Sequence, residues 1–454
     1  MFINIMKDNI MFINRINELQ ALNDEYAKDG ARFAVIYGRR RVGKTALISE
    51  FMKGKIGVYH YATTSPNSAN ELGRSLAAAL NIPLSHKLKF ENFTEVFELL
   101  IECMPKENAN NTPQKLIIAI DEFQNLAIAD RNFISEFQRI FDTIIAKSNV
   151  MLIICGSVIS MMHSLALDYQ APLYGRRTVN FHIKPLKFKH IKEFLPSLSK
   201  LDQILIYTSF GTIPKYLQSY EENKDFVLNL KNNILDKNSY LYSEGQFLLN
   251  SEITEPASYF SILESISKGN TKIGSIASSL GVSSTYLTRY LAKLVQLDLV
   301  EKEIPITEQN PLKSKFGRYR IVDKYLNFWF YYVYKNYSLL EISNQEAVLN
   351  EIKLNFYDKF VSFAFEDVVK EMILDNPKEL IGFIPTKVGR WWDNKNEIDL
   401  VALSEKNICF IECKWQNNAH TQKVLSHLVE KSKNLINDKI PSYKVFTKEW
   451  FLAT

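Results

Sequence analysis

Four short apolar runs lie in the first part of the chain. Their apolar residues follow one another without polar interruptions, which is the pattern of strands buried on both faces of a parallel sheet. Segments with helical spacing separate them. The runs cover residues 33–37, 57–61, 116–120 and 151–155. We therefore predict an α/β domain at residues 1–186, in which helices cover a parallel sheet.

The spacing of apolar residues changes after residue 186. Residues 187–250 have helical spacing and no strand-like run, so we predict a helical lid there. Residues 251–340 begin with short helices and end in an aromatic stretch, which predicts a winged-helix domain and a connecting helix. Residues 341–454 are predicted to form a smaller α/β domain.

The winged-helix prediction depends on three helical segments, at residues 259–267, 272–280 and 284–297. Gly281 suits a left-handed turn after the second segment, and Ser283 suits the N-cap of the third. The third segment would be the recognition helix. Its polar side chains can face solvent or a DNA backbone: Ser284, Thr285, Thr288, Arg289 and Lys293. Both DNA contact and an intramolecular role fit this pattern. The aromatic run at 325–334 is strongly apolar, which predicts a buried helix.

Composition narrows the class of protein. At roughly 150 residues per domain, a chain of 454 residues allows about three domains. Apolar residues make up 46% of the chain, which excludes a disordered or fibrous protein. The net charge is +5, from 55 Lys and Arg against 50 Asp and Glu. This balance permits a local anion site, but it does not by itself indicate a protein that coats nucleic acid.

Three features indicate a cytoplasmic location. The four cysteines lack the spacing and His partners of a metal site, as in a reducing compartment. No run of about 18 uncharged apolar residues is long enough to cross a membrane. Lys7 and Asp8 interrupt the apolar stretch that a signal peptide would need.

The strongest chemical signal directly follows the first apolar run and reads GRRRVGKT. Its glycines let the backbone wrap a polyphosphate, so that N–H groups and the following helix N-terminus face the phosphate oxygens. Lys44 would contact the β- and γ-phosphates, and Thr45 would hold Mg²⁺. The predicted ATP-binding residues here are Gly38, Arg39, Arg40, Arg41, Val42, Gly43, Lys44, Thr45 and Ala46. Because the loop backbone carries the phosphate, the alternative for the three arginine side chains is that they point outward, to solvent or to an acidic partner.

Two further strand ends would complete this site. Asp121 and Glu122 follow the run at 116–120. Asp121 is placed to hold Mg²⁺, and Glu122 to polarise the attacking water. Ser157 follows the run at 151–155 and is a candidate γ-phosphate sensor, although it also suits a helix cap.

The order of motifs resembles the prokaryotic AAA-related ATPases often called archaeal-type ATPases, which belong to the STAND group. The similarity covers roughly residues 12–220 and rests on GRRRVGKT, IDEFQ, ICGS, LYGRRT and GTIPKYL. It implies a P-loop ATPase with a helical lid, in which Pro214 lies near the nucleotide. Arg176 and Arg177 would neutralise charge on the nucleotide, in the same or a neighbouring subunit of an oligomer. A solvated basic turn is the alternative for this pair.

The C-terminal part carries a second candidate site. Two strand-like runs place Asp399 on one strand, and Glu412 and Lys414 on one face of the next. If the two faces meet, the carboxylates could hold one Mg²⁺ while Lys414 contacts a phosphate. Glu366, on an earlier helix, is a further candidate ligand. This spacing resembles the PD-(D/E)xK, restriction-endonuclease-like fold, and a tail catalogued as a domain of unknown function commonly follows such ATPases.

Two functions fit the sequence. The first is an ATPase that couples nucleotide state to a DNA-binding or nuclease-like C-terminal domain. The second is an ATP-dependent switch or scaffold that binds a partner protein, with an inert tail. ATP and Mg²⁺ are the expected cofactors under both hypotheses.

Overall fold

The computed structural model describes residues 12–104, 114–253, 255–417 and 419–454. The chain divides into two compact units, unit 1 at Met1–Pro185 and unit 2 at Leu186–Thr454. The predicted boundary at residue 186 lies beside this division. The predicted boundaries near 250 and 340 fall inside unit 2 and stay predictions.

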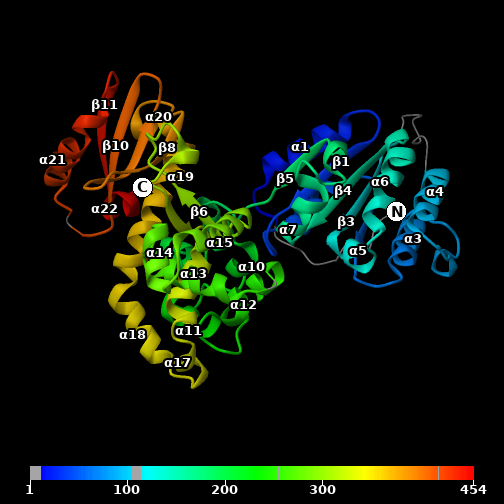
Figure 1. Ribbon diagram of the computed structural model, residues 1–454, viewed down its shortest axis with the longest axis horizontal. Helices are drawn as coiled ribbons and strands as arrows, with labels where there is room; N and C mark the ends of the chain where they lie inside the picture. Colours follow the sequence, from blue (N-terminus) through cyan, green and yellow to red (C-terminus); the bar gives the residue numbers. More distant parts are fainter. Residues whose placement is uncertain (1–11, 105–113, 254, 418) are drawn as a thin grey trace. The chain divides into compact units, whose positions relative to one another are not determined.

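Unit 1 contains a five-stranded sheet in the order β2-β3-β4-β1-β5, with neighbouring strands parallel (Figure 1). The four predicted parallel strands are confirmed. The fifth strand was not predicted, because it is short and only partly buried and so lacks a continuous apolar run. The strands are β1 (Arg32–Tyr37), β2 (Gly57–Tyr61), β3 (Leu116–Asp121), β4 (Val150–Gly156) and β5 (Val179–His182).

Helices cover both faces of this sheet. Alternate residues of the strands, such as Phe33 and Val35 on β1, join a core with apolar side chains of α3, α4 and α6. Helices α1 and α2 contact each other, and they also contact β1 and β3 respectively. The helices of unit 1 are α1 (Ile16–Ala27), α2 (Lys44–Met52), α3 (Ser68–Ala79), α4 (Phe93–Cys103), α5 (Gln124–Ala129), α6 (Phe133–Thr143) and α7 (Ile159–Met162).

Unit 2 begins with the helices of the predicted lid. No strand occurs among the described residues of this segment. They are α8 (Ile191–Phe194), α9 (Lys200–Ser209), α10 (Pro214–Leu217), α11 (Phe226–Asn233) and α12 (Tyr240–Glu252). Tyr216 of α10 donates a 2.7 Å hydrogen bond to the buried Glu244 carboxylate of α12, which links the two helices.

Three helices and a hairpin follow. They are α13 (Ala257–Ser267), α14 (Ile273–Leu280), α15 (Ser284–Gln296), β6 (Val300–Glu303) and β7 (Arg318–Ile321), and the two strands pair antiparallel. Gly281 has a φ of 67° at the end of α14, and the Ser283 hydroxyl accepts from the N–H of Tyr286, as the sequence predicts. On α15 the leucines at 287, 291 and 294 are buried and form the core face of this helix.

The aromatic run is buried, as predicted. It forms α16 (Lys324–Phe328) and a π-helical segment, Trp329–Tyr334. Trp329 is fully buried, and its indole N–H donates to the carbonyl oxygen of Tyr242 at 2.7 Å. The chain continues as α17 (Tyr337–Glu341), α18 (Gln345–Phe356), a second π-helical segment (Tyr357–Val361), α19 (Ser362–Asp375) and α20 (Pro377–Ile381).

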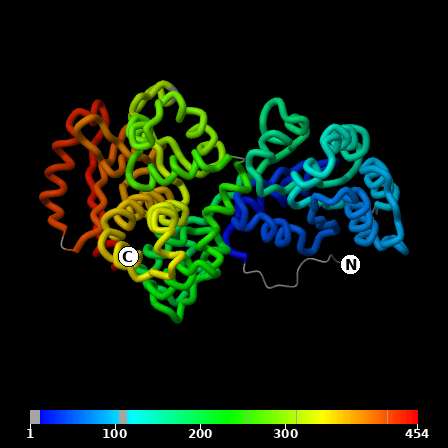
Figure 2. The backbone as a smooth tube through the Cα atoms, turned by 60° about the horizontal axis from the view of Figure 1, so that its bottom comes forward, coloured from blue at the N-terminus to red at the C-terminus, as the bar shows by residue number. Residues whose placement is uncertain are grey.

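The C-terminal region forms a four-stranded sheet in the order β11-β10-β9-β8. Strands β10 and β11 are parallel, and the other neighbours are antiparallel. Helix α19 contacts β8, β9 and β10, while the last helix, α22, contacts α9 (Figure 2). The elements are β8 (Lys387–Trp392), β9 (Glu397–Leu403), β10 (Asn407–Lys414), α21 (Thr421–Ser432), β11 (Ile440–Thr447) and α22 (Lys448–Ala453).

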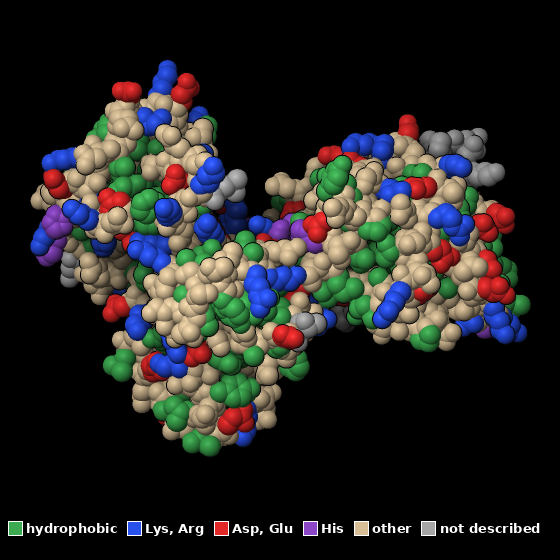
Figure 3. Space-filling model, viewed as in Figure 1, with side chains coloured by type: hydrophobic (Ala, Val, Ile, Leu, Met, Phe, Trp, Pro, Cys, Tyr) green, Lys and Arg blue, Asp and Glu red, His purple; other side chains and the backbone are tan. Residues whose placement is uncertain are grey.

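The surface carries mixed charge. On the face drawn in Figure 3, basic and acidic side chains are interspersed over both units. Among the helices of the described residues, none combines the length and the apolar character that a membrane span requires.

Candidate functional site

The loop between β1 and α2 has the backbone that its glycines permit. Gly43 adopts a φ of 97° directly before α2. Gly38 has a φ of 148°, and a Cβ there would lie 2.3 Å from the carbonyl oxygen of Ile183. Alanine therefore does not fit at Gly38 without a shift of the backbone. The loop is fixed at both ends, with its last residues leading into the N-terminus of a nine-residue helix.

Lys44 is held inside this loop. Its side chain is buried, and Nζ donates to the carbonyl oxygens of Gly38 and Arg39, each at 2.9 Å. Two backbone oxygens thus orient an ammonium group within the curve of the loop. A cation at this position suits a polyphosphate that the loop wraps.

Thr45 and Asp121 come together as predicted. The Thr45 hydroxyl donates to Asp121 Oδ2 at 2.7 Å, and the Tyr59 hydroxyl donates to the same oxygen at 2.7 Å. Burial, and next the Asp121 charge, raise the pKa of the Tyr59 hydroxyl well above its ordinary value, so Tyr59 stays a donor. A hydroxyl and a carboxylate side by side are the hard oxygen ligands that Mg²⁺ prefers.

Glu122 and Ser157 also meet. Ser157 Oγ donates to Glu122 Oε2 at 2.7 Å, and the side-chain amide of Gln124 donates to the same oxygen. Glu122 itself has a left-handed φ of 51°, and its N–H donates to Asp121 Oδ1 at 2.9 Å. The backbone turn at the end of β3 therefore directs the two carboxylates to different donors. Asp121 accepts from Thr45 and Tyr59, whereas Glu122 accepts from Ser157 and Gln124. Ser157 here contacts the carboxylate of Glu122, and a sensor role toward phosphate stays a prediction.

The remaining predicted loop residues differ in exposure. Arg39 and Val42 are buried, whereas Arg40 is exposed, with Nε 3.4 Å from Ser157 Oγ. Arg41 takes a left-handed φ of 71°, and Ala46 lies in the first turn of α2. The carbonyl oxygen of Val42 accepts from the buried Arg15 guanidinium at 3.1 Å. Arg15 also donates to the carbonyl oxygen of Lys184, and so ties the loop to the end of unit 1.

Arg176 and Arg177 have other partners in unit 1. Arg176 makes a bidentate ion pair with Asp142, at 2.7 and 2.6 Å. Arg177 donates to the carbonyl oxygens of Ala166 and Leu167, and its guanidinium stacks 4.3 Å from the ring centre of Tyr174. Pro214 begins α10 in unit 2. The nucleotide roles of all three residues stay predictions.

The C-terminal candidates form a second cluster. Strands β9 and β10 are paired up to Leu400 and Ile411, and Asp399 and Glu412 come directly after this pair. Lys414 Nζ lies 2.8 Å from Glu412 Oε1 and 3.9 Å from Asp399 Oδ2, so one ammonium contacts both carboxylates. Lys431 of α21 lies 3.7 Å from Glu412 Oε1.

Burial perturbs these carboxylates. Burial, and next the charge of Glu412, raise the pKa of Asp399 to about 6. Glu412 Oε2 is buried and has no hydrogen-bond partner within the described residues. Burial also raises the pKa of Glu366 to about 8, although Arg390, 2.8 Å from its Oε2, opposes the shift. In the ranges that the structure covers, no group of three or more His, Cys, Asp or Glu side chains is arranged to hold a metal ion. The metal roles of Glu366, Asp399 and Glu412 stay predictions.

Comparison with known proteins gives the family. Residues 12–220 match a family described as an ATPase domain predominantly from Archaea. Residues 329–425 match a second family, of archaeal and bacterial proteins of unknown function. The uncharacterized protein MJECL04 of Methanocaldococcus jannaschii is 37% identical over 442 residues, which cover 95% of this chain and 94% of that protein. The chain belongs to the archaeal-type ATPase family.

Among solved structures, this archaeal-type ATPase is similar to the Walker-type ATPase PABY2304 of Pyrococcus abyssi. The TM-score is 0.51 at 18% identity, over 70% of this chain and 96% of that one. At this identity the likeness shows a shared fold. The predicted resemblance is confirmed at the level of an ATP-binding P-loop ATPase, while the winged-helix, STAND and nuclease-like assignments stay predictions.

Sequence reasoning missed several partners of the ATPase site. Tyr59 lies on β2, and Gln124 begins α5, yet both donate to the acids at the end of β3. Gln124 is the last residue of the IDEFQ motif, but no role was assigned to it, and no motif contains Tyr59. Their positions were a further signal: Tyr59 lies two residues before the carboxyl end of β2 and Gln124 three residues after that of β3, at the edge where ligands bind in this class of sheet.

Proposed function

We propose that this archaeal-type ATPase hydrolyses ATP with Mg²⁺ at the loop of Gly38–Thr45. The observation that carries the proposal is the 2.7 Å hydrogen bond from Thr45 to Asp121, beside the buried Lys44. It joins the loop that follows β1 to the end of β3, which lies beyond β4 in the sheet, and so places a hydroxyl and a carboxylate where Mg²⁺-dependent phosphoryl transfer uses them. When bound, Mg²⁺ would neutralise phosphate charge between these two oxygen ligands.

The protein's own residues then have separate tasks. Lys44 and the backbone N–H groups of the loop bind the phosphates and orient them. Glu122 accepts a proton as water attacks the γ-phosphorus, the bond to the bridging oxygen breaks, and ADP leaves. Hydrogen bonds from Ser157 and Gln124 hold the Glu122 carboxylate in place before this step.

The test of these roles is the Glu122→Gln variant. We expect it to bind ATP but to lose turnover by about 10²–10⁴-fold, because glutamine cannot accept the proton. Lys44→Ala should instead lose binding. Phosphate release measures turnover, and calorimetry measures affinity. Turnover of Glu122→Gln at the wild-type rate would contradict the assignment of the base.

We further propose that the C-terminal sheet cleaves nucleic acid under control of the ATPase. Two observations support it: a lysine that contacts both Asp399 and Glu412, and a buried Glu412 oxygen with no partner in the described residues. An oxygen left without a partner fits a cation that is bound only with substrate.

Plasmid nicking tests the nuclease proposal. Purified protein with Mg²⁺ and ATP should nick supercoiled plasmid, and Asp399→Asn should reduce the rate by at least about tenfold, because a hard anionic ligand is lost. The matched control is Asp393→Asn, at an exposed aspartate between β8 and β9. Equal nicking by the Asp399→Asn variant would contradict the proposal.

A second candidate function is an ATP-dependent switch that binds a partner protein. The observation that favours it is that two of the candidate metal-binding carboxylates of the C-terminal domain already form ion pairs. Glu412 pairs with Lys414, and Glu366 pairs with Arg390. This function predicts ATP hydrolysis with no nicking by the wild-type protein at any Mg²⁺ concentration. The plasmid assay therefore separates the two candidates.

A further inference from the structure

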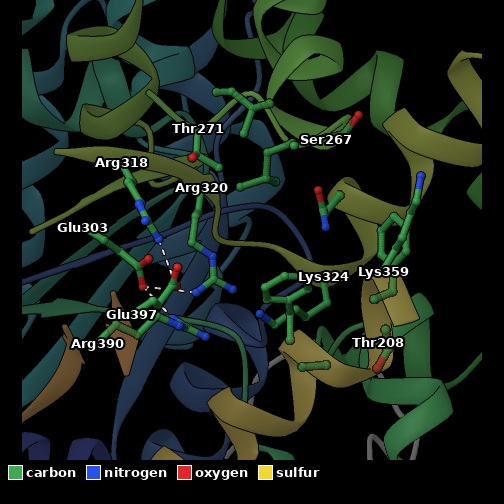
Figure 4. Close-up of a pocket in the computed structure, with 17 residues that line it drawn as sticks. Thr208, Ser267, Thr271, Glu303, Arg318, Arg320, Lys324, Lys359, Arg390 and Glu397 are labelled. Atoms are coloured by element: carbon green, nitrogen blue, oxygen red, sulfur yellow. Dashed lines mark hydrogen bonds and ion pairs between the residues drawn. The ribbon is translucent and has the colours of Figure 1, made fainter. Parts of the chain in front are cut away.

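A cavity of about 290 Å³ lies within unit 2. Its walls come from the hairpin strands β6 and β7, from β8 and β9, from helices α9, α13, α16 and α19, and from the π-helical segment Tyr357–Val361 (Figure 4). None of Asp399, Glu412 and Lys414 is among the described residues that line it. Its size is near the lower end of typical small-molecule sites, roughly 300–1,000 Å³.

The cavity has a basic lining. Five cations face two carboxylates: Arg318, Arg320, Lys324, Lys359 and Arg390 against Glu303 and Glu397. In Figure 4 the three arginines gather with Glu303 and Glu397 on one side, and Lys359 lies on the opposite side. An anionic ligand suits such a lining, because its negative charge would balance the excess of positive side chains.

Most of these cations already have acidic partners. Arg318 pairs with Glu397 at 2.9 Å, and Arg390 pairs with Glu303 at 2.7 Å. Arg320 shares Glu303, and Lys324 pairs with Asp367, which adjoins the lining.

Lys359 differs from the other four. Its Nζ donates to the Tyr331 hydroxyl at 2.8 Å, and no carboxylate within the described residues lies in ion-pair distance. Its side chain is also exposed, so the ammonium can turn to a ligand at little cost. The positive charge available to an anion is therefore on this side of the cavity.

The same side carries an aromatic wall. Phe360 is buried, but Phe363 is 51% exposed, although both line the cavity. A half-exposed phenylalanine next to a lysine offers a face on which a planar ring can stack. Asn327 also lines the cavity, and its side-chain amide has no hydrogen-bond partner in the described part of the chain. An amide can both donate to and accept from the edge of a base.

We propose that this cavity binds a nucleotide unit, with its phosphate on Lys359 and its base against Phe363. The site is separate from the triphosphate loop, which belongs to unit 1. Two sources share this chemistry, a free nucleoside monophosphate and the 5′-phosphorylated end of a single strand. The proposal does not depend on the nuclease proposal.

Calorimetry with AMP tests the site in the full chain carrying Lys44→Ala, which removes the triphosphate site from the measurement. AMP should bind, and Lys359→Ala should weaken binding about tenfold through loss of a charged hydrogen bond. Phe363→Ala should weaken it about fivefold through loss of stacking. Both side chains are exposed, so neither variant should disturb folding.

Matched controls come from α18. Lys353→Ala and Leu354→Ala change an exposed lysine and an exposed apolar residue that do not line the cavity, and AMP affinity should be unchanged. A 5′-phosphorylated oligonucleotide that binds with the same two losses, where AMP does not, identifies a strand end as the ligand. The proposal is overturned if neither probe binds at millimolar concentration, or if Lys359→Ala and Phe363→Ala leave affinity unchanged. Equal affinity for inorganic phosphate and AMP would also overturn it.

Discussion

His60 shows how burial changes a single titratable side chain in unit 1. It lies on β2 with 6% of its surface exposed, and Nδ1 is 3.2 Å from the Ser75 hydroxyl. Burial lowers its pKa to about 4, against a small opposing effect of Glu71. In the unfolded chain the pKa of this imidazole would be about 6.5. The imidazole is therefore neutral in the folded state at pH values where the unfolded chain already binds a proton.

This shift predicts acid sensitivity. The stability that His60 contributes is fully present above pH ~6.5 and is lost as the pH falls toward 4, because the unfolded state then binds more protons. We expect about 3 kcal/mol of unfolding free energy to be lost over this window. Denaturant titrations at several pH values give the unfolding free energy at each pH. Between pH 6.5 and 4 this free energy should fall less steeply in His60→Gln than in the wild type. The matched control is exposed His86→Gln, and an equal slope in His60→Gln and wild type would contradict the prediction.

Ion pairs join several elements of unit 2. Arg390 on β8 contacts Glu303 of β6 at 2.7 Å, and Glu366 and Asp367 of α19 at 2.8 Å each. Arg320 of β7 shares two of these acids. The hairpin, the helix and the C-terminal sheet are thus connected through one buried guanidinium.

Removing that guanidinium should destabilise unit 2. Arg390→Ala leaves three carboxylates without their shared partner, at an expected loss of about 3–5 kcal/mol. The matched control is Lys231→Ala, which breaks an exposed pair with Glu346 and should cost less than about 1 kcal/mol. Chemical denaturation measures both values. A similar small loss in the two variants would show that the Arg390 cluster does not hold these elements together.

Local sequence patterns predicted the helices, strands and turns well, but they did not predict the side-chain contacts between distant elements. The loop at Gly38–Thr45, four sheet strands and the turn at Gly281 each depend on a few consecutive residues, so the sequence predicts them. Strand β5 was missed because its four residues are only partly buried. The Arg390 cluster joins residues up to 87 positions apart, and no local pattern specifies such a contact.

For the whole molecule, the candidate sites are divided between the two units. Unit 1 holds the residues of the triphosphate site, and unit 2 holds the cluster at Asp399 and the cavity at Lys359. Both proposals for the output require ATP to bind first in unit 1. The central claim is therefore that the loop of Gly38–Thr45 binds this nucleotide.

Calorimetric titration of the full chain with ATP and Mg²⁺ tests that claim most directly. We predict saturable binding that is lost in Gly38→Ala, where the added Cβ would lie 2.3 Å from the Ile183 carbonyl oxygen and the φ is 148°. Gly175→Ala, with nothing within 4 Å of the added atom, should bind like the wild type. The claim is contradicted if the wild-type chain does not bind ATP, or if Gly38→Ala binds it with equal affinity.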